Sequence, residues 1–242
     1  MACRSLCDLA PMLHCGCVGA RLLGMAYPEQ ETVTRGESSD SGGDGDPCFH
    51  RLVIVRHGET AWSRQGRHTG NTDLPLEPRG VLQAEALRDR LADEAFAAVL
   101  VSPLVRARMT CALAGLSSEA MVCDDLREWD YGHDEGRTTS EIRSERPDWS
   151  VWGSGPLGGE TVQEVGVRVD RVIHTARGFS GDVIAFAHAH VLRILAARWL
   201  GLPASAGAHW VLDPASVSVL GWERDTPAVV RWNEVGSAPV VL

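Results

Sequence analysis

Five polar side chains have the types needed for chemistry on an anionic ester. They are two arginines, two histidines and a glutamate: Arg56, His57, Arg106, Glu128 and His188. A neutral imidazole is a nucleophile near pH 7 and can accept a phosphoryl group directly. Arginine presents a planar fork to two phosphate oxygens and stabilises the charge on a transferring phosphoryl group. These residue types favour a phosphate ester as substrate, with no metal or other cofactor required.

The role of each residue follows from its type. His57 is the candidate nucleophile, and Arg56 and Arg106 are candidate phosphate ligands. His188 adds two N–H donors to the phosphate when it is protonated. Glu128 is the candidate proton donor to the leaving oxygen and then the base for the water that attacks the phosphorylated enzyme.

Each of these residues also has a purely structural interpretation. His57 could be a satisfied residue at a strand end, Arg106 a solvated or ion-paired side chain, and Glu128 a surface ion-pair partner. The pair His188 and His190 could be one inward and one outward histidine, or two metal ligands. Residue type alone leaves these alternatives open.

A regular alternation of strands and helices must position the candidates. Short apolar, β-branched runs predict buried strands, and amphipathic spacing after a proline predicts helices. The expected strands cover 51–55, 97–101, 120–123 and 182–187, with two β-rich runs near 215–223 and 227–232. One expected helix begins at 78, and three others cover 103–115, 160–177 and 190–200. This order predicts an α/β fold with a mostly parallel central sheet flanked by helices on both faces.

All five candidates follow predicted strands. Arg56 and His57 end the first strand, and Arg106 lies one turn into the helix after the second. Glu128 follows the third strand and His188 the fourth. Ligands bind beyond the carboxyl ends of strands in such sheets, so we expect the five side chains in one cleft.

The composition excludes several function classes. The chain has 242 residues, a net charge of −9, and 23 basic residues that are all arginine. Without lysine it has no Schiff-base, P-loop or kinase-type lysine. The acidic balance argues against nucleic acid as a partner. No apolar run approaches the ~20 residues that would cross a membrane.

The first 50 residues differ from the rest. They hold five of the seven cysteines, and residues 35–47 are rich in Gly, Ser and Asp. We expect 1–50 to be a disordered extension or an over-extended start, and 51–242 to be the working domain. Cys111 and Cys123 are expected to be core thiols. Without a disulfide framework, the default location is the cytoplasm.

Four blocks resemble the histidine phosphatase superfamily, the phosphoglycerate mutase-like proteins. They occur in that family's order: RHGET at 56–60, SPLVRARMT at 102–110, EWDYGHDEG at 128–136 and AHAHVLRILAARWLGLP at 187–203. The resemblance implies a three-layer phosphoglycerate mutase-like fold, with His57 as the phosphorylated nucleophile and Glu128 as the proton donor. It also implies a phosphate pocket built from Arg56, Arg106 and His188.

The branch of the family follows from the segments around the site. GRHTGNTDLPL at 66–76 resembles the loop that contacts substrate. The expected substrate contacts are Ser63, His68, Thr69, Gly70 and His190, with Arg137 as a weaker candidate. Mutases of the family carry an arginine directly after the acid and use a lysine, whereas Trp129 follows the acid here. Ala189 replaces the glycine that usually follows the second histidine. The resemblance is strongest to acid phosphatase-like and sedoheptulose-bisphosphatase-like members.

The expected function is metal-independent hydrolysis of a phosphomonoester through a phosphohistidine. The expected substrate is a sugar phosphate or another small phosphorylated metabolite. Three alternatives remain open: a phosphoglycerate mutase, a metal hydrolase with His57, His188 and His190 as ligands, and a binding module that senses a phosphorylated ligand. The oligomeric state is open as well, a homodimer included.

Overall fold

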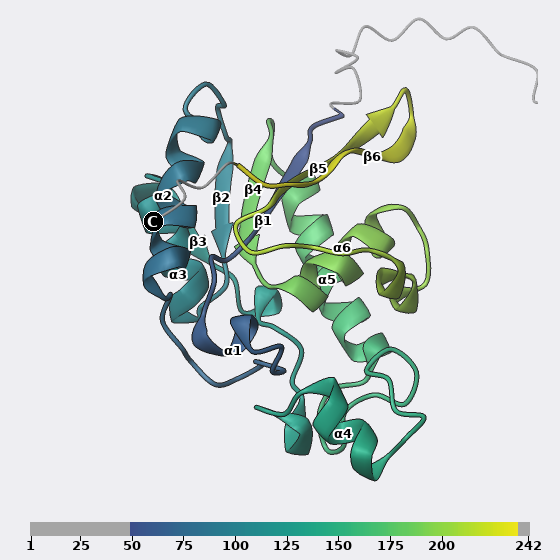
Figure 1. Cartoon of the computed structure of the whole chain (residues 1–242). Helices are drawn as coiled ribbons and strands as arrows, with labels where there is room; N and C mark the ends of the chain where they lie inside the picture. The colour runs from purple at the N-terminus through teal and green to yellow at the C-terminus, as the bar shows by residue number, and fades with distance from the viewer. Residues whose placement is uncertain (1–48, 237–242) are drawn as a thin grey trace, which may run out of the picture. The chain divides into compact units, whose positions relative to one another are not determined.

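A six-stranded sheet organises the part of the chain that the structure, a computed structural model, describes, which is residues 49–236 (Figure 1). The strand order is β3-β2-β4-β1-β5-β6. The expected extension at 1–50 lies outside these residues, apart from its last two. None of the helices in this range is long and apolar enough to cross a membrane.

The strands lie where the apolar runs predict them: β1 (Leu52–Arg56), β2 (Ala98–Val101), β3 (Ala120–Val122), β4 (Val183–Ala187), β5 (Val217–Glu223) and β6 (Thr226–Glu234). β4 pairs in parallel with β1 and with β2, and β2 pairs in parallel with β3. β5 pairs antiparallel with both β1 and β6. The mostly parallel sheet is confirmed, and its two C-terminal strands are the antiparallel part.

Two pairs of helices cover the two faces of the sheet. Helices α2 (Pro78–Leu91) and α3 (Val105–Leu113) pack on one face, and α5 (Val162–Arg177) and α6 (Ala189–Trp199) pack on the other (Figure 1). Helix α2 begins at a proline, whose missing N–H costs nothing at that position. Helix α5 begins with a capping box between Thr161 and Glu164. The expectation of helices on both faces is confirmed.

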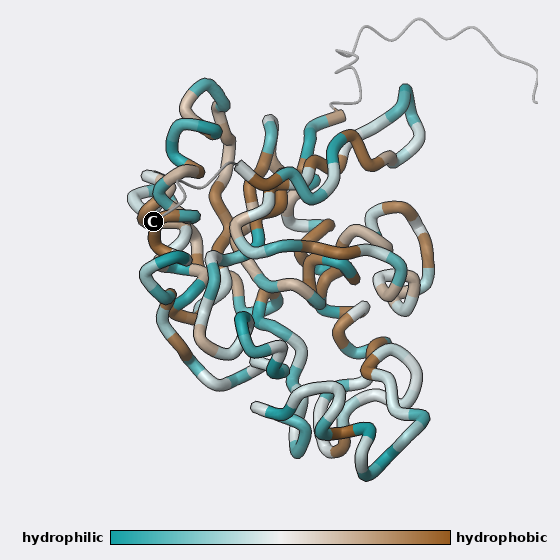
Figure 2. The backbone as a smooth tube through the Cα atoms, viewed as in Figure 1, coloured by the Kyte–Doolittle hydropathy of each residue, from teal (hydrophilic) through white to brown (hydrophobic). Residues whose placement is uncertain are grey.

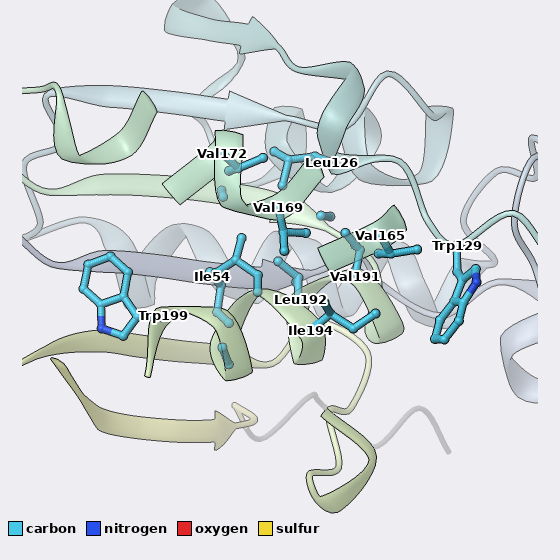
Figure 3. Packing of buried hydrophobic residues seen from close by; sticks show 14 of the residues in the cluster. Ile54, Leu126, Trp129, Val165, Val169, Val172, Val191, Leu192, Ile194 and Trp199 are labelled. Atoms are coloured by element: carbon cyan, nitrogen blue, oxygen red, sulfur yellow. The ribbon is translucent and has the colours of Figure 1, made fainter. Parts of the chain in front are cut away.

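The larger hydrophobic cluster lies between the sheet and the α5–α6 pair. Ile54 of β1 packs there with Val169 of α5 and Leu192 of α6, and Trp199 and Trp129 lie at opposite ends of the cluster (Figure 3). Apolar residues concentrate along the strands, whereas the segment around the short helix α4 (Thr139–Glu145) is largely hydrophilic (Figure 2). Close packing on both faces fixes the carboxyl ends of the parallel strands, where the candidate residues lie.

Helix α4 and the short helix α1 (Ala61–Arg64) lie beyond one end of the strands (Figure 1). Sequence periodicity predicts neither helix. Buried Asp134 holds the segment around α4 together: it pairs with Arg146 and accepts a hydrogen bond from the Leu157 N–H at 3.1 Å. Four 3₁₀ turns complete the described elements: Ser117–Glu119, Asp124–Leu126, Gly132–Asp134 and Ala204–His209.

Candidate active site

Three neighbouring parallel strands bring the candidate residues together. The His57 N–H donates to the Ala187 carbonyl at 3.0 Å, and the Ser102 N–H donates to the Phe186 carbonyl at 2.9 Å. The ends of β1, β2 and β4 are therefore level. The ring centroids of His57 and His188 lie 5.2 Å apart. The expected convergence of the two histidines at the strand ends is observed.

The His57 ring is held in one tautomer. Its Nδ1 lies 2.7 Å from the Gly58 carbonyl, which can only accept, so Nδ1 carries the proton and Nε2 carries the lone pair. The side chain is 5 % exposed. Burial, and then the charges of Arg106 and Arg56, hold the His57 pKa well below 6.5. The ring is therefore a neutral imidazole with a free nitrogen, the form that attacks phosphorus.

The turn after His57 depends on two glycines. A Cβ added to Gly58 would lie 2.3 Å from the Gly80 carbonyl oxygen, so the turn after β1 and the start of α2 approach each other more closely than any side chain allows. The Gly58 N–H donates to Thr110 Oγ1 at 3.1 Å, and that hydroxyl donates to the Arg106 carbonyl at 2.8 Å. The turn that carries His57 is thus fixed against both α2 and α3.

Arg56 directly precedes His57, the candidate nucleophile, and uses only part of its guanidinium inside the protein. Its Nη1 donates to the Leu212 carbonyl at 2.5 Å, whereas its buried Nε has no hydrogen-bond partner among residues 49–236. A buried N–H group without an acceptor is costly and rare in folded proteins. The Arg56 residue itself lines the cavity beside His57, where an anionic ligand would lie close to its positive charge.

His188 makes two contacts inside the protein. Arg106 Nε donates to its Nδ1 at 3.1 Å, and its Nε2 lies 2.7 Å from Ser102 Oγ. Because Nδ1 accepts, the single ring proton is on Nε2. Burial, and then the Arg106 charge, hold the His188 pKa well below 6.5. From the sequence we expect a protonated His188 that donates twice to phosphate. The observed ring is instead neutral, and both of its nitrogens are engaged inside the protein. Direct contact with phosphate stays a prediction.

The loop at 69–72 is bound from two sides. Arg106 Nη2 donates to the carbonyls of Thr69 and Gly70, both at 3.0 Å, and its Nη1 donates to the Thr72 carbonyl at 2.9 Å. The Glu135 carboxylate accepts from the Gly70 N–H at 2.9 Å and from the Thr72 N–H at 3.0 Å. Arg106 is fully buried behind the loop and does not line the cavity. Its role as a phosphate ligand stays a prediction.

Glu128 lies at the N-terminus of α6. Its carboxylate accepts from the backbone N–H groups of Trp129 at 3.0 Å, Val191 at 2.9 Å and His190 at 3.1 Å. The side chain thus replaces an N-cap, since His188 at that position makes no side-chain cap bond. It is 6 % exposed and faces the cavity, so its interpretation as a surface ion pair is wrong.

Arg56, His57 and Glu128 border a cavity of about 170 Å³, whereas Arg106 and His188 are buried behind its lining. Pockets for drug-sized ligands hold roughly 300–1,000 Å³, so this one suits a phosphoryl group with a small leaving group. The lining comes from four stretches of chain: Arg56, His57, Ser63, Gly66, Arg67, His68, Thr69, Glu128, Tyr131, Ala189 and His190. Larger hollows near α2 and α3 contain none of the site histidines.

Four of the expected substrate contacts line this cavity, namely Ser63, His68, Thr69 and His190, and Gly70 does not. A Cβ on Gly70 would lie 2.4 Å from the Trp129 carbonyl oxygen, so its role is close packing. The Arg137 side chain is turned to Glu145 at 2.6 Å and is also outside the lining.

Sequence reasoning missed Arg67, Tyr131 and Glu135 as site residues. Tyr131 stands within the EWDYGHDEG block, and its hydroxyl lies 2.6 Å from His190 Nδ1. Arg67 lies in the segment that resembles a substrate loop, but nothing in its own type or spacing singles it out. Glu135 accepts hydrogen bonds from backbone N–H groups, and because nearly every residue has such a group, the sequence does not show which ones it binds.

Metal ligation would need several donor side chains close together. Within residues 49–236, no group of three or more His, Cys, Asp or Glu residues is placed to hold a metal ion. In particular, His188 and His190 have different neighbours. His188 contacts Arg106 and Ser102, whereas His190 contacts Tyr131 and lines the cavity.

Two relatives of the chain are phosphatases. The chain is 41 % identical over 179 residues to an acid phosphatase of Mycobacterium tuberculosis, an overlap of 72 % of this chain and 88 % of the relative. It is 40 % identical over 187 residues to sedoheptulose 1,7-bisphosphatase of Saccharomyces cerevisiae, an overlap of 63 % and 68 %.

The fold also matches a solved structure. The structure of an open reading frame product from Mycobacterium tuberculosis matches with a TM-score of 0.74 and 39 % sequence identity, covering 77 % of this chain and 98 % of that one. The family model for the histidine phosphatase superfamily (branch 1) matches residues 52–235. The chain is a phosphatase and belongs to branch 1 of the histidine phosphatase superfamily.

Proposed function

We propose that this phosphatase hydrolyses small phosphomonoesters, sugar phosphates among them, through a phosphohistidine at Nε2 of His57 and without a metal ion. The observation that carries the proposal is the His57 ring, neutral and held by the Gly58 carbonyl so that Nε2 is the free nitrogen. The acid phosphatase and bisphosphatase relatives support the substrate class.

In the first step, the Nε2 lone pair forms a bond to phosphorus and the P–O bond to the leaving group breaks. The leaving oxygen takes a proton from Glu128. Arg56, which lines the cavity, donates a hydrogen bond to a phosphoryl oxygen. A fixed positive donor at this place stabilises the charge on the transferring group without reorganising.

In the second step, water attacks phosphorus and the P–N bond breaks, which returns the electron pair to Nε2. The Glu128 carboxylate accepts a proton from that water, so both groups regain their starting states. The three backbone N–H groups that hold Glu128 keep its carboxylate at the cavity through both steps.

A mutase needs a cation for the carboxylate of a phosphorylated glycerate. The residue after the acid, Trp129, is fully buried, and its Nε1 donates to the Glu160 carbonyl at 2.7 Å. The position after Glu128 therefore supplies no cation for that carboxylate, which favours transfer to water over transfer between hydroxyls of a glycerate.

We also propose that the protein works in a reducing compartment such as the cytoplasm, because Cys111 and Cys123 are free thiols. Its partner would be the phosphorylated metabolite itself. A homodimer remains a prediction, and gel filtration with light scattering would test it.

Phosphate release across a panel of phosphomonoesters, with and without EDTA, tests the function. We expect turnover that EDTA leaves unchanged, and its abolition in His57→Ala. The control is His174→Ala, an exposed histidine on α5. Wild-type turnover in His57→Ala would refute the phosphohistidine, loss of activity in EDTA would refute metal independence, and isomer formation without phosphate release would indicate the mutase.

A further inference from the structure

Beyond the phosphate end, four residues of the cavity lining form what we term the recognition cluster: Arg67, His68, Tyr131 and His190. The ring centroids of His68 and Tyr131 lie 4.9 Å apart, and those of His68 and His190 lie 6.1 Å apart. Trp149 closes the cluster with an edge-on contact to His68 at 5.3 Å. The leaving group of the substrate must fit against these rings.

The rings of the cluster are uncharged hydrogen-bonding groups. His190 Nδ1 is engaged with the Tyr131 hydroxyl at 2.6 Å, and His68 Nε2 lies 3.3 Å from Thr139 Oγ1. Burial lowers the pKa of both histidines, that of His190 to well below 6.5. Neutral imidazoles and a phenol suit hydroxyl groups and carbon faces, whereas an anion requires a cation or several N–H donors.

Arg67 is the cation of the cluster, and its charge already has a partner. Its Nη1 donates to Glu141 Oε2 at 3.0 Å and to the Gly136 carbonyl at 2.7 Å. Glu141 belongs to helix α4, where its carboxylate also accepts from the Thr138 N–H at 2.8 Å as part of a capping box. A second anion on the substrate would compete with this carboxylate for Arg67.

We propose that the recognition cluster selects phosphomonoesters whose leaving group carries no second anionic group, and that Glu141, through its ion pair with Arg67, determines this specificity. The proposal rests on the phosphatase function proposed above and narrows its substrate class. Uncharged polyols and sugars have hydroxyl groups that meet the cluster's polar atoms. The second anion of a phosphorylated acid or a bisphosphate would enter a cavity whose Arg67 is already paired with Glu141.

Two probes whose leaving groups differ by one charge test the proposal. The leaving group of glycerol 1-phosphate is the neutral triol glycerol, and that of 3-phosphoglycerate is the carboxylate glycerate. We expect the wild-type kcat/KM to favour glycerol 1-phosphate by about tenfold, the scale of one unfavourable charge pair near a protein surface. Glu141→Gln keeps the capping box and removes the charge. It should reduce the preference by about three- to tenfold.

Glu145→Gln is the matched control. Glu145 ends the same helix and its removal takes away the same charge, but its partner is Arg137 at 2.6 Å rather than Arg67. The kcat/KM preference of Glu145→Gln for glycerol 1-phosphate over 3-phosphoglycerate should stay within about twofold of the wild-type preference. An equal effect of the two variants, or a wild-type preference for 3-phosphoglycerate, would overturn the proposal.

Dissociation constants measured by calorimetry in the His57→Ala background give the same preference without turnover. Binding with the expected preference in a wild-type protein that releases no phosphate would refute the hydrolytic function and retain the specificity. Turnover with the opposite preference would refute the specificity alone. Failure of both probes to bind would refute the assignment of the cavity and with it the proposal.

Discussion

Arg106 donates from Nε to Nδ1 of His188 at 3.1 Å, and with the rest of its guanidinium it binds the carbonyls of the loop at 69–72. One buried side chain therefore ties a histidine at the end of β4 to the loop that carries Thr69 into the cavity. The two parts of the site cannot shift independently. Glu135 completes this arrangement by holding the N–H groups of the same loop.

Removal of the Glu135 carboxylate should loosen the loop. In Glu135→Ala, the Gly70 and Thr72 N–H groups lose acceptors at 2.9 and 3.0 Å. Hydrogen bonds to charged groups contribute roughly 1.5–3 kcal/mol each, so we expect KM for glycerol 1-phosphate to rise about tenfold and Tm to fall. Glu135→Gln should recover part of both effects. Steady-state kinetics with exposed Glu119→Ala as control would show it, and an unchanged KM would contradict it.

Glu128→Gln should discriminate between leaving groups. General acid catalysis contributes roughly 10²–10⁴-fold, and it matters most when the leaving oxygen is basic. We expect a loss of about 100-fold with glycerol 1-phosphate and of less than about tenfold with p-nitrophenyl phosphate. Equal losses on the two substrates would remove the proton-donor role. The Tm of the variant reports whether its amide still occupies the N-terminus of α6.

Gly58→Ala should destabilise the protein and inactivate it. The new methyl group would lie 2.3 Å from the Gly80 carbonyl oxygen, and both atoms belong to packed backbone. Overpacking of this kind costs about 1–3 kcal/mol or more and would displace His57. Gly153→Ala is the control, because an added Cβ there meets nothing within 4 Å. Denaturant unfolding measures the difference, and equal stability of the two variants would contradict the close approach of Gly58 and Gly80.

The free energy of unfolding should fall as the pH drops below about 6.5. His57, His188 and His190 all have folded-state pKa values well below 6.5, each chiefly because of burial. Below about pH 6.5 the unfolded chain therefore binds protons that the folded chain does not. The contribution of these histidines to the free energy of unfolding is fully present above their unfolded-state pKa and is lost as the pH falls toward their folded-state pKa. Each histidine adds a slope of about 1.4 kcal/mol per pH unit in this window.

Replacement of one of these histidines tests the linkage. Urea unfolding of His190→Gln between about pH 5 and 7 should show a slope smaller by one histidine's share. His174→Gln changes an exposed residue and should keep the wild-type slope. An identical slope in His190→Gln and wild type would show that His190 titrates alike in the folded and unfolded chains.

The sequence predicts most of the fold because its signals are local. β1, β2 and β4 are apolar runs, and α5 repeats valines at helical spacing after the Thr161 cap. The order of the strands in the sheet cannot be predicted from local signals, because β4 lies between β1 and β2 and so pairs with residues far away in the chain. Helix α4 has one buried residue, Ile142, so no apolar stripe could reveal it.

The site divides in the same way. His57, Glu128 and His188 could be found because their types carry chemistry and they follow strands. The functions of Arg106 and Glu135 in holding the loop at 69–72 could not, since their partners are backbone carbonyl and N–H groups that every sequence has. The sequence does not single out Arg67, because its ion-pair partner Glu141 lies 74 residues further along the chain.

The hydrogen bond between His57 Nδ1 and the neighbouring carbonyl has a practical consequence for trapping the enzyme. In the mechanism proposed above, Nδ1 is engaged, so only one of the two isomeric phosphoramidates would form, the one on the nitrogen remote from the backbone. Such P–N bonds hydrolyse in acid and survive in alkali. An acid quench would therefore erase the covalent species and report none, whereas an alkaline quench of the same reaction would retain the label on the protein.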